Sequence, residues 1–232
     1  MSGAGFGGAA RVNESGRVEA FSDGVFAVAI TLLVLGIKVP TGDDLGRLLT
    51  SGSTVDSFGA YVVSFLVVGI MWANHHQVFS FVARVDRVLL FLNLVLLLVV
   101  VALPWATDVV AEYLSRPRDA PLAVALYSGF MVAHALTFGA LWWWLTRTGH
   151  LFDARVDVEA ARRTRVRFAL GGLAYPVLVG LAFVSAPLAM VLHGVLAGYY
   201  GFNQLPVPVR EGRPRAEREG MAEGPAGEDG AL

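Results

Sequence analysis

Six apolar stretches, each about as long as a membrane crossing, constrain this chain more than any other feature of its sequence. A helix rises about 1.5 Å per residue and the hydrocarbon core of a bilayer is about 30 Å thick, so a crossing takes roughly 17–25 residues. The stretches run from Phe21 to Ile37, Phe58 to Ala73, Val88 to Ala106, Pro121 to Leu145, Phe168 to Val184 and Leu188 to Phe202. Only 16% of the residues are charged, against about a quarter in soluble domains. The sequence therefore predicts an all-α integral membrane protein with six transmembrane helices.

The last two stretches are separated only by Ser185, Ala186 and Pro187. Proline lacks the N–H that continues a helix and disfavours helical geometry in the residue before it. One kinked helix from Phe168 to Leu205 would be about 57 Å long, roughly twice the hydrocarbon thickness. Two crossings joined by a tight hairpin are therefore expected.

Basic residues predict the orientation, because Lys and Arg in short loops stay on the cytoplasmic side. With the N-terminus inside, six crossings place 14 of the 18 basic residues in the cytoplasm and leave four outside, namely Lys38, Arg47, Arg116 and Arg118. Both termini are therefore expected to be cytoplasmic. All basic residues except Lys38 are Arg, a bias typical of GC-rich bacterial genomes, so we expect a multi-pass protein of the bacterial inner membrane.

The stretches divide the chain into three parts. Residues 1–16 are expected to form a flexible N-terminus and residues 17–205 the six-helix membrane domain. Residues 206–232 are rich in Arg, Glu, Gly and Pro, with almost nothing to bury, and are expected to form a disordered cytoplasmic tail. No cleavable signal peptide is evident, so the first crossing is expected to be retained.

Composition excludes several classes of function. The chain has no cysteine, which removes disulfides, thiolate metal sites and cysteine nucleophiles. Its net charge of −1 offers no basic excess for a nucleic-acid backbone. The adjacent His75 and His76 would point about 100° apart on a helix, so they do not form a two-ligand metal face. We expect no metal, no cofactor, no nucleic-acid partner and no enzyme activity.

Several polar residues interrupt the apolar stretches. Ser22 and Asp23, near the start of the first stretch, could simply cap a helix. Four further groups are expected to make hydrogen bonds between helices: Asn93, His134, Thr137 and His193. Gly194 and Gly198, four residues apart, offer a small-residue face for close helix contact.

One motif is more specific than these single residues. It consists of Arg17, Phe21, Ser22, Asp23 and Gly24, followed by an apolar run. This RxxxFSDG pattern resembles the signature of the transmembrane protein 175 family of potassium channels. Two weaker pieces also match: Trp72 with the pair His75 and His76, and Asn93 followed by Leu103 and Pro104. The resemblance implies a homotetramer in membrane lipid, with one six-helix repeat per chain and the motif residues and His75 in a structural network.

The same resemblance implies roles for one face of the first helix. At 100° per residue Gly24, Val28, Thr31, Leu32 and Leu35 form a single stripe, with Asp23 off it. Periodicity alone leaves open whether the stripe faces lipid, protein or a pore. In the family the first helices line the pore, which makes Val28, Leu32 and Leu35 the expected hydrophobic gate and Thr31 the expected selectivity residue. No TVGYG-like filter occurs. We expect passive potassium conduction through a pore that opens by wetting.

Two other functions are compatible with the residues. A proton-coupled transporter could use Asp23, His75 and His134 as a relay, although no pair of broken spans occurs in corresponding halves. A membrane redox protein could bind haem between His134 and His193.

Overall fold

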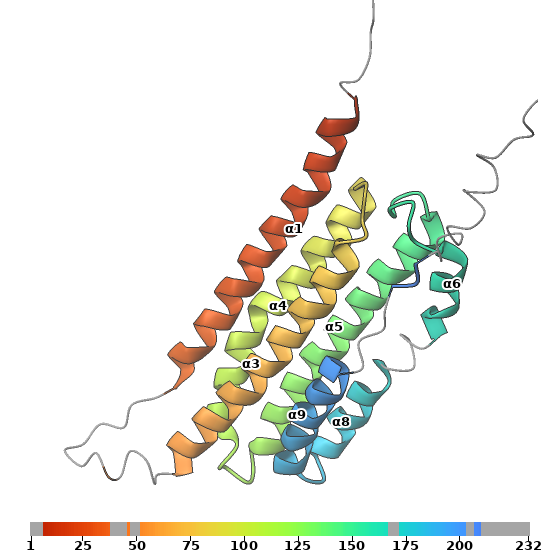
Figure 1. Ribbon diagram of the computed structural model, residues 1–232. Coiled ribbons are helices and arrows are strands. Elements are labelled where there is room, and N and C mark those ends of the chain that lie inside the picture. The colour runs from red at the N-terminus through yellow and green to blue at the C-terminus, as the bar shows by residue number, and fades with distance from the viewer. Residues whose placement is uncertain (1–6, 38–45, 47–51, 167–171, 203–206, 210–232) are drawn as a thin grey trace, which may run out of the picture.

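The structure, a computed structural model, describes residues 7–37, 46, 52–166, 172–202 and 207–209, and these residues are mostly helical (Figure 1). The helices are α1 (Gly7–Leu32), the 3₁₀ helix η1 (Leu33–Gly36), α3 (Gly52–Phe79), α4 (Arg87–Tyr113), α5 (Ala120–Thr148), α6 (Val158–Arg163), α8 (Ala174–Ala182) and α9 (Ala186–Phe202). Within these ranges the only β-structure is two isolated bridges. The prediction of an all-α fold is confirmed for the described residues.

Four helical segments are long and apolar enough to cross a membrane: Ser15–Gly36, Thr54–Phe79, Arg87–Tyr113 and Ala120–Thr148. They contain the first four predicted stretches, apart from Ile37. Helix α9 falls at the predicted sixth stretch and rises about 26 Å, while α8 has nine residues and rises only about 14 Å. Residues 167–171, at the start of the predicted fifth stretch, lie outside the described part of the chain.

The four long helices, α1, α3, α4 and α5, extend beyond the apolar stretches predicted for them. Helix α1 begins at Gly7, inside the segment of residues 1–16 that was expected to be a flexible N-terminus. Helix α3 continues past Ala73 and through both histidines to Phe79. The reason is that apolarity marks the part of a helix that lies in lipid, whereas the backbone stays helical wherever its hydrogen bonds continue.

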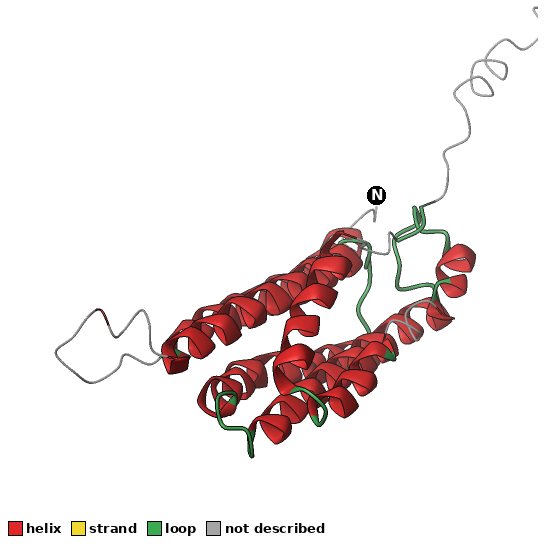
Figure 2. Cartoon of the chain, turned by 90° about the horizontal axis from the view of Figure 1, so that it is seen from below, coloured by secondary structure: helices red, strands yellow, loops and turns green. Residues whose placement is uncertain are grey.

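The helices pack around α4 and α5 (Figures 1 and 2). Helix α1 lies along one edge of the bundle and, among the described elements, contacts only η1, α3 and α4. On the other side, α8 and α9 form the predicted hairpin, which packs against α5 and α3. The hairpin turns between Ala182 and Ala186, where the Ser185 hydroxyl accepts a hydrogen bond from the Leu188 amide (3.4 Å). Helix α1 is therefore the long helix with the least cover from its own chain.

Loops at the carboxyl ends of α3 and α5 join into a small platform. Val82 pairs with Phe152, and Val156 pairs with Val209. The Asp157 amide donates to the Pro208 carbonyl (2.9 Å), and Val207 is buried. Residues 207–209, near the start of the tail expected to be disordered over 206–232, thus lie in this platform. In the same platform, hydrogen bonds from Arg155 lower the pKa of Asp153. The bond from the Arg155 backbone amide has the larger effect, and the bond from its guanidinium adds to it.

Small residues bring α9 close to α3. A Cβ placed on Gly194 would lie 3.5 Å from Val63, and one on Gly201 would lie 3.1 Å from Ile70. A Cβ on Gly198 would meet no atom within 4 Å. The close face is therefore formed by Gly194 and Gly201, seven residues apart, and Gly198 lies outside it, contrary to the sequence pattern.

Candidate functional site

Helix α1 has two faces with different surroundings. Ser22, Phe26, Ala29 and Leu33 are buried against the rest of the bundle. On the opposite side the predicted stripe is open, with Val28 56% exposed, Leu32 40% and Leu35 75%. Thr31 and Gly24 are exposed on the same side. All five stripe residues therefore lie on a surface that their own chain leaves uncovered.

The stripe changes helix type within its length. The backbone is α-helical up to Leu32 and becomes a 3₁₀ helix over Leu33–Gly36. Residues three apart are eclipsed in a 3₁₀ helix, so Leu35 stands nearly above Leu32, about 6 Å further along the axis. An unbroken α-helix, which the sequence stripe assumed, would separate the two by about 60° around the axis and about 4.5 Å along it. The two leucines thus form one column.

The buried face of α1 is held by a chain of hydrogen bonds through three helices. The Asn93 amide of α4 donates to Ser22 Oγ (2.9 Å), and its carbonyl oxygen accepts from His75 Nε2 of α3 (2.8 Å). Ser22 Oγ donates onward to the Val18 carbonyl (2.9 Å). All three side chains are buried, and His75 stacks on Phe79 with ring centroids 4.2 Å apart. A buried hydrogen-bond chain of this kind fixes the rotation of α1 against the bundle.

A second set of contacts lies beside the first. Trp72 Nε1 donates to Asp23 Oδ1 (2.9 Å), and His76 Nδ1 lies 3.1 Å from Glu19 Oε1. The rings of Trp72 and His76 stack on each other at 5.7 Å. The resemblance implies a structural network of the motif residues with His75; in the structure the hydrogen-bond donor to Asp23 is Trp72. The two adjacent histidines have different partners, so they do not face a common point.

The other motif residues face outward. Arg17 and Phe21 are exposed and lie along a groove of about 540 Å³ between α1 and α4, with Asn93 at its base. Within the described residues no hydrogen bond or ion pair involves Arg17. A Cβ on Gly24 would meet nothing within 4 Å, so this glycine leaves the surface of α1 bare. The structure therefore brings together Ser22, Asp23 and His75 and leaves Arg17, Phe21 and Gly24 on the uncovered side.

Thr31 orients its hydroxyl through its own helix. Its Oγ1 donates to the Val28 carbonyl (2.9 Å). A hydroxyl has one hydrogen and two lone pairs, so this bond uses the hydrogen and leaves oxygen lone pairs on the open side of α1. Such an oxygen can accept a hydrogen bond from water or coordinate a cation.

The histidines of α5 and α9 belong to a separate region. His193 is buried, lies 2.9 Å from Ser128 Oγ through its Nε2 atom, and stacks with Tyr175. The cavity that His134 and His193 share measures about 60 Å³, room for a few water molecules but not for a porphyrin. Among the described residues no hydrogen bond links Asp23, His75 and His134, so the relay of the transporter alternative is not connected.

A buried polar chain that sequence reasoning missed joins α3, α4 and α5. Thr107 Oγ1 lies 2.8 Å from Ser64 Oγ, which donates to the Tyr127 hydroxyl (3.1 Å). Single Ser and Thr residues in apolar runs are the available signal, but sequence does not say which helices bring them together. Trp72 was noted only as part of a motif, and its role as donor to Asp23 depends on the same packing.

Comparison with known proteins decides the family. The family model described as the endosomal/lysosomal potassium channel TMEM175 matches residues 17–104. A protein of Streptomyces collinus named as a potassium channel is 68% identical over 201 residues, which cover 86% of this chain and 98% of that protein. The chain belongs to the TMEM175 family.

Two further TMEM175 relatives differ in what their names say. The crystal structure of a lysosomal potassium-selective channel TMEM175 homolog from Chamaesiphon minutus has a TM-score of 0.68 and 38% identity, covering 82% of this chain and 97% of that one. Human TMEM175, named as an endosomal/lysosomal proton channel, is 39% identical over 112 residues, 44% of this chain and 22% of that protein. The motif residues from Arg17 to Gly24, His75 and Asn93 all lie inside the part that the family model matches.

Proposed function

We propose that this protein is a potassium channel whose pore is formed by the uncovered faces of α1 from four copies of the chain. The observation that carries the proposal is the division of α1 into a face locked by Ser22, Asn93 and His75 and a face left open along Val28, Thr31, Leu32 and Leu35. Bacterial relatives that match most of this chain are named as potassium channels. These relatives match 86% and 82% of this chain, whereas the human proton channel matches 44%.

The proposed assembly is a homotetramer with six crossings per chain and both termini in the cytoplasm. Four long apolar helices, the α8–α9 hairpin and the 14-to-4 division of basic residues support this topology. The bacterial relatives support placement in a bacterial inner membrane. The permeant ion is potassium, passing down its gradient without a resident cofactor.

The proposed gate works by excluding water. Leucine and valine side chains offer no oxygen to replace the hydration shell of an ion, so a ring of them blocks ions when it is dry and conducts when it is wet. The column of Leu32 and Leu35 lengthens that apolar section. Thr31, with lone pairs on the open side, provides the oxygen layer closest to it, which is why we assign it to potassium preference.

The test is ion flux from potassium-loaded liposomes together with reversal potentials in planar bilayers. The parent protein should carry potassium down its gradient, without a coupled proton, as a pH-sensitive dye inside the liposomes would report. Val28→Asn or Leu35→Asn should raise basal current several-fold, because amides in the constriction hold water. Discrimination against sodium should fall in the same variants.

Leu33→Asn is the matched control, since Leu33 is buried on the locked face. It should reduce expression or folding without creating a leak. If Leu33→Asn leaks while Val28→Asn and Leu35→Asn behave like the parent, the pore is not on the uncovered face. Flux that requires a proton gradient would favour the transporter instead.

A further inference from the structure

An apolar groove of about 480 Å³ lies between α5 and α8, on the opposite side of the bundle from α1. Leu136, Gly139 and Trp143 of α5 line it together with Leu173 and Pro176, and Arg165 lies at one end. The volume falls in the range of about 300–1,000 Å³ typical of ligand sites. It is therefore large enough to take more than water.

The groove is about as long, measured along α5, as one membrane leaflet is thick. Its lining on α5 extends from Val132 to Trp143, which corresponds to about 16 Å along the helix axis. The apolar span of α5 ends at Thr148, so Trp143 lies near the membrane surface and Val132 near mid-membrane. Half of a 30 Å hydrocarbon core is about 15 Å. One acyl chain of a lipid would match this length.

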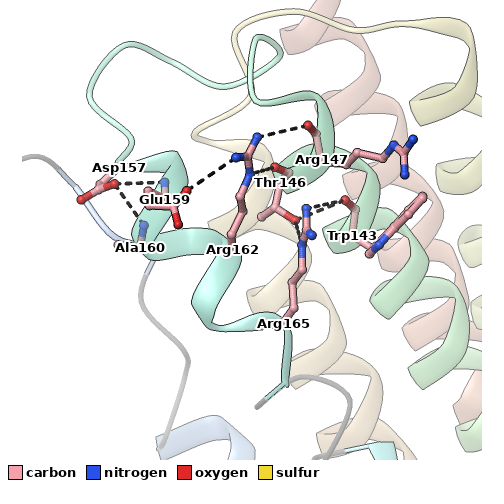
Figure 3. A network of polar contacts seen from close by, with 8 residues as sticks. All are labelled: Trp143, Thr146, Arg147, Asp157, Glu159, Ala160, Arg162 and Arg165. Atoms are coloured by element: carbon pink, nitrogen blue, oxygen red, sulfur yellow. Dashed lines mark hydrogen bonds and ion pairs between the residues drawn. The ribbon is translucent and has the colours of Figure 1, made fainter.

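Arginine side chains gather around Trp143, near the carboxyl end of α5 (Figure 3). The Arg147 guanidinium lies 5.0 Å from the centre of the Trp143 ring, and Arg165 donates to Thr146 Oγ1 (2.7 Å) and to the Trp143 carbonyl (3.5 Å). Neutral groups thus position both arginines. Within the described residues no carboxylate pairs with either of them or lines the groove. Their charges are left for a ligand.

We propose that this groove binds one anionic glycerophospholipid per subunit. An acyl chain lies along Leu136, Gly139 and Leu173, and the phosphate lies beside Arg147 and Arg165, whose guanidinium groups suit phosphate oxygens. Trp143 sits where the two parts of the lipid meet, as expected of an interfacial tryptophan. This site requires only that the protein lies in a membrane and is independent of the proposed pore.

Competition between an anionic and a zwitterionic lipid, measured by native mass spectrometry, tests the role of the arginine charges. Delipidated full-length protein receives equal amounts of phosphatidylglycerol and phosphatidylcholine with the same acyl chains. The parent should retain phosphatidylglycerol in at least fivefold preference, at one molecule per subunit. Arg147→Gln should lower that preference about fivefold, as expected for one interfacial charge. Arg155→Gln, which removes an arginine paired with Asp153 outside the groove, should leave it unchanged.

Two glycines of α5 test the groove itself. A Cβ on either Gly139 or Gly129 would meet no atom within 4 Å, but only Gly139 lines the groove. Gly139→Leu should abolish the retained lipid, and Gly129→Leu should not. Equal retention of both lipids by the parent protein would overturn the proposal without any variant. Unchanged binding in Gly139→Leu, or displacement of the lipid by glycerol 3-phosphate alone, would also overturn it.

Discussion

Asn93 joins α1 to α3 through its own helix, α4. Its amide reaches Ser22 on one side and its carbonyl oxygen reaches His75 on the other, so one side chain links three helices. In the apolar interior neither neighbour has water as a substitute partner. These two hydrogen bonds affect the exposed residues of α1 only indirectly, because they fix the rotation of the helix.

Replacing Asn93 by Ala should therefore reduce the folded protein without changing ion preference in what remains. Each group left unpaired costs about 1–3 kcal/mol. The measurement is the yield and thermal stability of the purified oligomer. Adding His75→Ala should cost less in the double variant than the sum of the single changes, since the two residues share a bond. Fully additive losses would mean that the network does not act as a unit.

A substitution at Thr31 should change ion preference and not the amount of folded protein. Thr31→Val removes the hydroxyl oxygen at nearly constant volume and leaves the apolar section intact. The potassium-to-sodium permeability ratio, taken from reversal potentials, should fall several-fold while basal current stays at the parent level. A rise in basal current with unchanged preference would assign Thr31 to the proposed gate and not to the proposed selectivity layer.

The elements show how far sequence reasoning reaches. Hydropathy located the long helices and Pro187 located the hairpin, because both features act locally. The stripe of α1 was predicted from periodicity, and its residues are exposed in the structure. Its 3₁₀ end was not predicted, since Leu33–Gly36 carries no local signal for that switch. The partners of Ser22 and Asp23 depend on how α1 lies against α3 and α4. That alignment comes from packing over many residues, which no motif encodes.

Helix α9 offers a prediction at this scale. Gly201→Leu places a side chain against Ile70, where even a Cβ would be only 3.1 Å away, and should separate α9 from α3. Gly198→Leu introduces the same residue one turn earlier into open space. Thermal unfolding of the purified protein should show a loss for Gly201→Leu, equivalent to about 1–3 kcal/mol, and almost none for Gly198→Leu. Equal losses would contradict the assigned contact face.

For the whole molecule, the topology can be tested because the chain has no cysteine of its own. Arg118 and Ala154 are both exposed, in loops at opposite ends of α5. In intact cells a membrane-impermeant thiol reagent should label Arg118→Cys and not Ala154→Cys. Labelling should become equal after the cells are permeabilised. The reverse pattern would place both termini outside.

The uncovered position of α1 also has a genetic consequence. A variant on the locked face, at Phe26 or Ala29, spoils folding of its own chain and leaves the other copies to assemble, so its effect is recessive. In the proposed tetramer, a variant at Val28 or Leu35 folds, assembles with the other copies and alters a pore shared by four chains. With equal expression of parent and variant, only about one tetramer in sixteen is free of the variant. The two faces of one helix thus carry alleles of opposite dominance.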